Sequence, residues 1–191
     1  MELIFIRHGQ GEHTLDIPVS LQLNDPSLTQ KGVEQARLLR SDLPLSKEDI
    51  IIISPIRRTL ETALIWSENV PCRKIITPLV SPRMFPILPN ATTLPCDKIL
   101  DINLIKSEYP NVEIDMTSPV ELWSEGINTM PESGFIEITK KFISRCREFN
   151  KEKIYIVSHD GTINSYRQLI SGQTLTRNDF LHDAGWFKIS C

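Results

Sequence analysis

The sequence lacks the features that would attach the protein to a membrane or a nucleic acid. Its N-terminus reads MELIFIRHG, and Arg7 and His8 interrupt this apolar run far short of a signal sequence or a membrane span. Basic and acidic residues are interspersed, and the formal net charge is -3, so no basic tract indicates a polyanion-binding surface. We therefore expect a cytoplasmic protein with no nucleic-acid or membrane partner.

Cysteine is scarce, and none of it shows the CxxC spacing of zinc or redox sites. We expect four free thiols, at Cys72, Cys96, Cys146 and Cys191. His182 and Asp183 form only a lone pair near the C-terminus, which is more typical of a polar turn than of a metal site. We expect no metal and no cofactor.

The composition is that of an ordinary globular protein. The chain has 191 residues, of which 40% are hydrophobic and 24% charged. This length is enough to bury a core without disulfides or metals, so we expect a single domain over residues 1–191.

The order of apolar segments predicts an α/β fold. Short apolar runs typical of buried strands alternate with segments of helical periodicity, among them Glu2 to Ile6, the helix after Thr29, Ile50 to Ile53, the helix after Pro131, and Ile154 to Val157. We expect three layers, helix-sheet-helix, with a mostly parallel central sheet. The proline-punctuated stretch at about 78–130 shows little periodicity beyond a possible helical turn at 104–108, and we interpret it as an irregular insertion.

Three predicted strand ends carry polar side chains. The first ends in Arg7 and His8, the second is followed by Ser54 and Arg58, and the third is followed by His159. Ligands of open α/β sheets bind outside the carboxyl ends of the strands, so these residues should meet at one edge.

Two arginines and two histidines at one edge indicate a pocket for a phosphoryl group. Guanidinium groups match phosphate oxygens bidentately and stay charged at every relevant pH. A neutral imidazole in line with phosphorus is a competent nucleophile, and His8 is the candidate. His159 would donate a further hydrogen bond to the transferring group.

Four motifs carry a resemblance to a known family. They read RHGQGEH from Arg7, DPSLTQKGVEQA from Asp25, SPIRRTLETA from Ser54 and VSHDGTI from Val157. In this order they resemble the signatures of the histidine phosphatase, or phosphoglycerate-mutase-like, superfamily. The resemblance implies that His8 is transiently phosphorylated, that Arg58 binds phosphate, and that His159 is the second catalytic histidine.

The segment that usually carries the family's proton donor departs from the pattern. Family members protonate the leaving oxygen with a Glu, whereas here the segment reads RMFPILPNATTLPCD and places Asn90 or Pro86 at that position. The pair His159-Asp160 resembles the acid phosphatase branch, in which that Asp is the proton donor, and this favours Asp160. Asp97, in the insertion, is the alternative.

Other residues are candidates for contact with the substrate. The backbone at Gly9, with Gln10 and His13, follows the nucleophile, and Asp97 could fold over the pocket. For His13, a structural role in the loop competes evenly with substrate contact.

We expect a phosphomonoester hydrolase that acts on a small phosphorylated metabolite through a phosphohistidine on His8. Two alternatives stay open: a phosphoglycerate mutase, and a non-catalytic module that binds a phosphorylated ligand. Neither the substrate nor the oligomeric state is indicated by the sequence.

Overall fold

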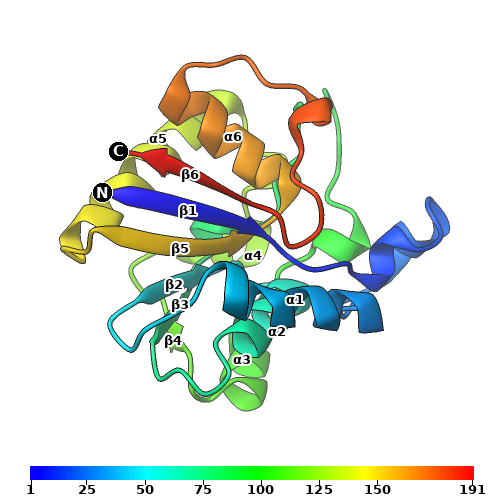
Figure 1. Ribbon diagram of the computed structural model, residues 1–191. Helices are drawn as coiled ribbons and strands as arrows, with labels where there is room; N and C mark the ends of the chain where they lie inside the picture. Colours follow the sequence, from blue (N-terminus) through cyan, green and yellow to red (C-terminus); the bar gives the residue numbers. More distant parts are fainter.

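A computed structural model describes residues 1–191 and contains one six-stranded sheet (Figure 1). The strand order is β4-β3-β2-β5-β1-β6. The strands are β1 (Glu2–Arg7), β2 (Ile50–Ile53), β3 (Arg73–Ile76), β4 (Glu113–Ile114), β5 (Lys153–Ser158) and β6 (Trp186–Ser190).

Five of the strands run parallel, and β6 pairs antiparallel with β1 at one edge of the sheet. The predicted α/β class with a mostly parallel sheet is confirmed. The register aligns the strand ends, because Arg7 at the end of β1 is paired with Ser158 at the end of β5. Ile53 at the end of β2 is paired with Val157, so these three strands end at the same level.

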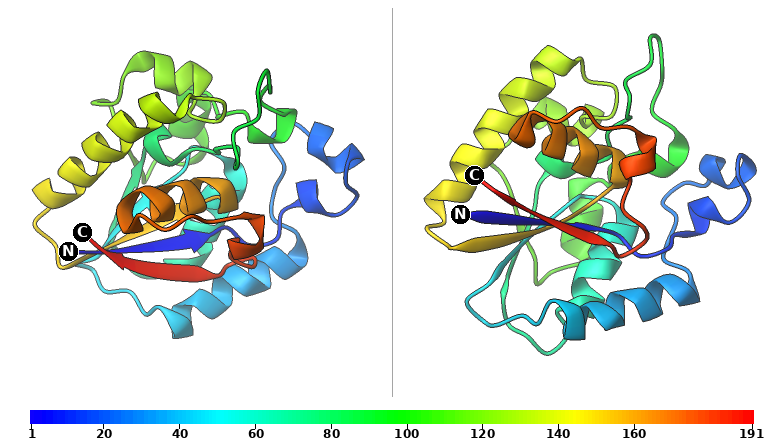
Figure 2. Two further views of the ribbon diagram at one scale, coloured as in Figure 1. Left: turned by 90° about the horizontal axis from the view of Figure 1, so that it is seen from above. Right: turned by 45° about the horizontal axis from the view of Figure 1, so that its top comes forward.

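Helices cover both faces of the sheet (Figure 2). They are α1 (Gln30–Asp42), α2 (Arg57–Trp66), α3 (Ile102–Glu108), α4 (Val120–Glu125), α5 (Glu132–Glu148) and α6 (Asp160–Ser171). Alternate strand residues such as Phe5 and Ile156 pack with α5 and α6 on one face. Ile6 and Val157 point to the other face and pack with α1, α2 and α3. Burial on both faces explains why these strands read as continuous apolar runs.

Local signals in the sequence agree with several observed boundaries. The α1 helix begins after Thr29, whose side chain accepts a hydrogen bond from the amide of Gly32, as expected of an N-cap. The run Ile50–Ile53 forms β2 with all four residues buried. The α6 helix begins at Asp160, with His159 as its N-cap.

The stretch at 78–130 is more ordered than the sequence predicted. It contains α3, which includes the predicted turn at 104–108, together with β4 and α4, which the sequence did not indicate. Strand β4 has two residues and α4 has six, so neither is long enough to show periodicity. Because β4 pairs with β3, this stretch adds a strand to the main sheet. That the whole chain forms a single domain stays a prediction.

None of the helices combines the length and the apolar character that a membrane crossing demands.

Candidate active site

The carboxyl ends of β1, β5 and β2 lie side by side and carry the predicted site residues (Figure 1). His8 follows β1, His159 follows β5, and Ser54 follows β2. The rings of His8 and His159 lie edge to face, with their centroids 5.2 Å apart. Residues that are distant in the sequence therefore converge on one edge of the sheet.

His8 is buried, and its hydrogen bonds define its tautomer. Its Nδ1 lies 2.7 Å from the carbonyl oxygen of Gly9. A carbonyl can only accept, so Nδ1 carries the proton and Nε2 keeps its lone pair. Arg58 donates from Nε to this Nε2 over 3.2 Å. The unprotonated Nε2 of His8 thus faces the guanidinium of Arg58, which is expected to bind phosphate.

His159 is held in the opposite tautomer. Arg58 can only donate, and its Nη2 lies 3.3 Å from Nδ1 of His159, so Nδ1 accepts. The proton is then on Nε2, which lies 2.8 Å from the hydroxyl oxygen of Ser54 and donates to it. Ser54 therefore fixes the orientation of the second histidine.

Arg58, in the first turn of α2, is the centre of the cluster. It is 1% exposed and contacts both histidines. Its Nη1 donates to the carbonyl of Cys96 at 2.7 Å, and its Nη2 donates to a carboxylate oxygen of Asp97 at 2.8 Å. The guanidinium is thus held between the strand ends and the segment that contains Asp97.

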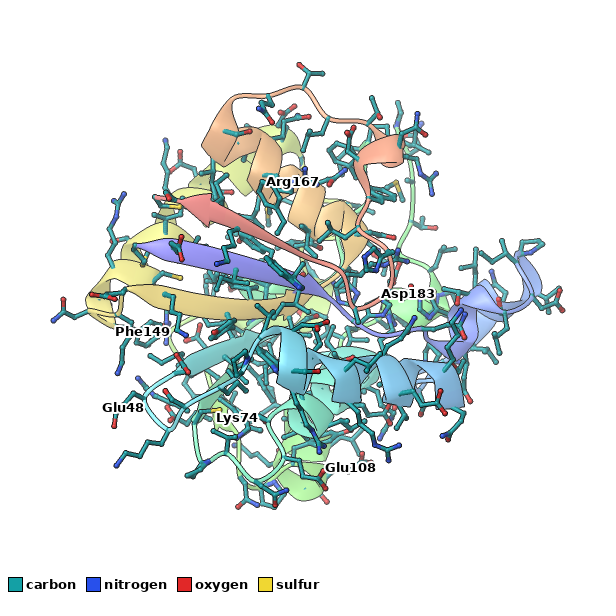
Figure 3. All side chains as sticks on the ribbon, viewed as in Figure 1. Glu48, Lys74, Glu108, Phe149, Arg167 and Asp183 are labelled. Atoms are coloured by element: carbon teal, nitrogen blue, oxygen red, sulfur yellow. The ribbon has the colours of Figure 1, made fainter.

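Arg7 lies beside the cluster formed by His8, Arg58 and His159. Residues after β5 hold its guanidinium. Its Nη1 donates to the carbonyl of Leu181 at 2.6 Å, and its Nη2 forms ion pairs with Asp160 at 3.2 Å and Asp183 at 3.4 Å. Figure 3 labels Asp183 in the loop beyond the end of β1. The Nε atom of Arg7 is buried and has no hydrogen-bond partner. This donor is available to an oxyanion.

The loop after His8 brings His13 to the same pocket. Its ring centroid lies 5.5 Å from that of His8, and its Nδ1 is buried without a partner. A Cβ at Gly11 would lie 2.6 Å from this Nδ1, so the loop needs glycine there to let His13 turn inward. His13 therefore faces the cluster, although its role toward a substrate stays a prediction.

The histidines are neutral because they are buried beside two guanidinium groups. Burial, followed by the charge of Arg58, lowers the pKa of His8 and of His159 well below the usual value of 6.5. The pKa of His13 falls to about 3 from burial and from the charges of Arg58 and Arg7. A neutral His8 is the form that can act as a nucleophile.

Two carboxyl groups border the pocket in different environments. Burial raises the pKa of Asp97, against the charge of Arg58 and with a contribution from the charge of Asp160. Asp160 is a third exposed, pairs with Arg7, and accepts a hydrogen bond from the amide of Gly161 at 2.7 Å. Of the two, Asp97 is the one in contact with Arg58.

Two predicted substrate contacts are engaged with other protein groups. The amide of Gly9 donates to the hydroxyl of Thr62 at 3.1 Å. The side-chain oxygen of Gln10 accepts from the hydroxyl of Thr29 at 2.9 Å. Both residues border the nucleophile, and their contact with a substrate stays a prediction. A Cβ at Gly9 would lie 2.6 Å from the carbonyl oxygen of Gly32, so the loop and α1 pack closely here.

No group of three or more histidine, cysteine, aspartate or glutamate side chains is arranged to hold a metal ion. His182 is exposed, and its Nδ1 lies 3.0 Å from the carbonyl oxygen of Asp183.

The chain is similar to known proteins in sequence and in fold. The sequence profile of the histidine phosphatase superfamily (branch 1) matches residues 3–81, which include Arg7, His8 and Arg58. This match covers about two fifths of the chain, so the N-terminal part resembles the histidine phosphatase superfamily. The sheet and helices of the chain also superimpose on an α-ribazole phosphatase from Shigella flexneri with a TM-score of 0.62, at 20% identity, over 100% of this chain and 90% of that one.

Curated relatives match the N-terminal part of the chain. A protein of Schizosaccharomyces pombe named "Probable phosphatase" is 40% identical over 69 residues, which are 35% of this chain and 32% of the relative. Phosphoserine phosphatase 1 of Hydrogenobacter thermophilus is 39% identical over 66 residues, which are 34% of this chain and 30% of the relative. The chain thus spans about a third of the length of the curated relatives it matches.

Sequence reasoning did not select some residues that complete this candidate site. Ser54 was noted only for its place at a strand end, whereas its hydroxyl fixes the tautomer of His159. Thr62 holds the amide of Gly9. Asn128 comes from the 78–130 stretch, where no pattern could have indicated it, and its side chain lowers the pKa of Asp97 against the effect of burial. The serine and threonine lie within the SPIRRTLETA motif, which was their only signal.

Proposed function

We propose that the protein is a phosphomonoester hydrolase that acts on a small phosphorylated metabolite through a phosphohistidine on His8. The observation that carries the proposal is the bond from Nδ1 of His8 to the carbonyl of Gly9, which leaves Nε2 unprotonated beside Arg58. A histidine with a purely structural role would not need an unprotonated Nε2 held beside an arginine.

In the first step, Nε2 of His8 attacks phosphorus, and the bond from phosphorus to the ester oxygen breaks. Arg58 and Arg7 bind the non-bridging oxygens, and the free Nε of Arg7 supplies a donor that no protein group uses. His159 lies beside His8, and it can donate to the same oxygens once its proton moves from Nε2 to Nδ1 and Ser54 donates to Nε2. The departing oxygen must take a proton from an acid.

We assign that acid to Asp97 rather than to Asp160, which the sequence favoured. Asp97 touches Arg58, and burial raises the pKa of its carboxyl group. A phosphoryl dianion on Arg58 would compete for the same guanidinium and offset the positive charge that favours ionised Asp97. Substrate binding therefore promotes the protonated acid. Asp160 pairs with Arg7 and with its own helix N-terminus, which favours a role in positioning Arg7.

In the second step, water attacks the phosphohistidine. The Asp97 carboxylate takes a proton from the water, the bond from phosphorus to Nε2 of His8 breaks, and inorganic phosphate leaves. His8 and Asp97 return to their starting protonation states. No redox partner or further reactant is required.

The relatives named above support a small substrate, since their names refer to phosphoserine and α-ribazole. Which phosphorylated compound this chain hydrolyses is open to a screen of phosphorylated metabolites. A phosphoglycerate mutase would return the phosphoryl group to an acceptor instead of water, so assays for free phosphate and for isomerised product separate the two activities.

The decisive experiment is to trap the intermediate. The protein is mixed with an aryl phosphate that has a good leaving group, quenched within milliseconds, and analysed by mass spectrometry at neutral or alkaline pH. We expect one phosphoryl group on His8, none in a His8→Ala variant, and an unchanged adduct in the control variant His182→Gln, which alters the histidine outside the pocket. A protein that binds phosphate but never forms the adduct would instead be a non-catalytic module.

A further inference from the structure

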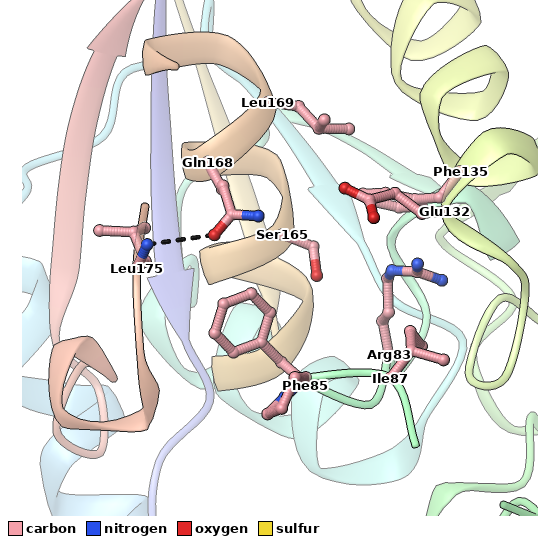
Figure 4. Close-up of a pocket in the computed structure, with 10 residues that line it drawn as sticks. Arg83, Phe85, Ile87, Glu132, Phe135, Ser165, Gln168, Leu169 and Leu175 are labelled. Atoms are coloured by element: carbon pink, nitrogen blue, oxygen red, sulfur yellow. Dashed lines mark hydrogen bonds between the residues drawn. The ribbon is translucent and has the colours of Figure 1, made fainter. Parts of the chain in front are cut away.

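A second cavity lies between α6, the start of α5 and the segment at 83–87 (Figure 4). Its volume is about 240 Å³, and none of the four residues expected to bind the phosphoryl group lines it. From α6 it is lined by Ser165, Gln168 and Leu169, which lie on one face of the helix at spacings of three and four residues. The proposed function makes no use of this cavity.

The cavity contains a buried guanidinium with unused donors. Arg83 is 6% exposed, and its Nη1 donates to the carbonyls of Ile127 at 3.1 Å and Met130 at 2.7 Å. Its guanidinium lies 4.1 Å from the ring centroid of Phe135. The Nε and Nη2 atoms bond to no protein atom, and no carboxylate oxygen lies within 4.0 Å. Burial lowers the pKa of Arg83 to about 10, so the group is cationic at neutral pH.

A buried cation without a direct counter-ion is costly unless an anion binds to it. A carboxylate matches the planar guanidinium and forms two parallel hydrogen bonds with it. Both of the nitrogens that Arg83 leaves unpaired are donors, as this pairing requires.

The rest of the lining mixes apolar side chains with the polar side chains of Ser165, Gln168 and Glu132. Phe85, Leu169 and Leu175 contribute side chains to the wall. Gln168 accepts from the amide of Leu175 through its oxygen at 3.1 Å, which leaves its Nε2 free, and Figure 4 shows this nitrogen turned away from Leu175. Apolar side chains beside a few placed polar groups are typical of small-molecule sites.

The negative charge of Glu132 limits how much negative charge a ligand of this cavity can carry. It is exposed in the first turn of α5, lines the cavity, and acts on Arg83 through its charge without touching it. This negative charge disfavours a ligand with two negative charges near Arg83. We propose that the cavity binds a small monocarboxylate with an apolar side chain, with its carboxylate on Arg83 and its side chain against Phe85, Leu169 and Leu175.

Isothermal titration calorimetry tests the proposal with four defined probes. They are 4-methylpentanoate, 3-phenylpropanoate, leucine and the uncharged 4-methylpentanamide. We expect saturable binding of at least one carboxylate, and at least about tenfold weaker binding of the amide, since it cannot form a charge-assisted pair with Arg83. Leucine binding as tightly as 4-methylpentanoate would identify an amino acid as the ligand, with its ammonium near Glu132. Absence of saturable binding by every carboxylate, or equal binding of the amide, overturns the proposal.

Variants locate the binding site independently of the phosphatase reaction. Arg83→Met removes the anchor, and Leu175→Trp fills the cavity from its half-buried rim, where a larger side chain has room to be accommodated. Circular dichroism verifies that each variant is folded. We expect both to lose binding by at least about tenfold and His8→Ala to retain it. The reverse pattern, loss in His8→Ala with retention in Leu175→Trp, would place the carboxylate in the catalytic pocket and refute a second site.

Discussion

The two walls of the catalytic pocket differ in origin. One wall follows the strand ends and carries His8 and His159, which the register of β1 and β5 aligns. The other wall comes from the 78–130 stretch and carries Asp97, which Arg58 holds through a side-chain hydrogen bond. The first wall is set by the backbone of the sheet, and the second by a few side chains. Changes to the first should slow the attack on phosphorus for every substrate, and changes to the second should slow substrates according to how much their leaving group needs a proton.

The largest effect is expected in the first wall. His8→Gln removes the nucleophile, and we expect kcat to fall by about 10⁴-fold or more for every phosphomonoester. Steady-state phosphate release measures the loss. Activity within tenfold of the wild type would show that phosphorus is attacked by water directly, without a phosphohistidine.

The effect of a change in the second wall should depend on the leaving group of the substrate. Asp97→Asn removes the proposed acid, so we expect kcat/KM to fall by about 10²- to 10³-fold for alkyl phosphates and by less than about tenfold for an aryl phosphate with a good leaving group. The matched control is Asp160→Asn. If Asp160 only positions Arg7, this variant should lose kcat/KM equally for alkyl and aryl phosphates. The opposite pattern would transfer the role of acid to Asp160.

The pH dependence of activity reflects the same two walls. Because the pKa of His8 is lowered well below 6.5, the nucleophile stays neutral in mild acid. The acid Asp97 works only while protonated, so kcat/KM should decrease up to tenfold per pH unit as pH rises through its raised pKa. We expect the alkaline limb of the profile to disappear in Asp97→Asn. If the alkaline limb persists in Asp97→Asn, it reports the titration of another group, and Asp97 is not the acid.

Stability should also depend on pH, through histidines buried in neutral form. The pKa of His13 is about 3 when folded and near 6.5 when unfolded, so the unfolded chain binds the extra proton between these values. The free energy of unfolding is therefore fully maintained above pH 6.5 and decreases below it, by roughly 2 kcal/mol at pH 5 from His13 alone. Urea denaturation at pH 7 and pH 5 measures the decrease. His13→Gln should show a smaller one, and an identical decrease in both proteins would contradict this assignment.

Ser54 should show the smallest effect, and it tests how the first wall is positioned. Ser54→Ala leaves the Nε2–H of buried His159 without its acceptor, and we expect kcat to fall about tenfold as the ring loses its fixed tautomer. The matched control is Ser158→Ala, which removes a buried hydroxyl bonded to the carbonyl of Val80. The control should lose stability and keep kcat, whereas equal kcat losses would assign Ser54 a purely structural role.

Some elements could be predicted because their signals are local. The uninterrupted isoleucines of β2 and the cap at Thr29 each depend on a few adjacent residues. The motifs placed Arg7, His8, Arg58 and His159 at strand ends and helix starts, and the parallel sheet brings them together. Strand β4 was missed because its two residues carry no pattern and depend on pairing with β3.

The proton donor illustrates what local signals leave open. From the sequence, Asp160 was favoured because it follows His159, and Asp97 lay in a segment without periodicity. In the fold, the side chain of Asp160 turns to Arg7, and Asp97 reaches Arg58 from 39 residues away in the chain. Nearness in sequence therefore did not indicate which carboxyl group contacts Arg58.

The sequence alone determined the α/β class and the residues at the strand ends, because apolar periodicity and motifs are properties of neighbouring residues. Only the tertiary structure decided the tautomers of His8 and His159, the contact of Asp97 with Arg58, and the burial of Arg83 in its own cavity. Each of these depends on hydrogen bonds and desolvation between segments that meet only when the chain is folded, and no local pattern encodes them.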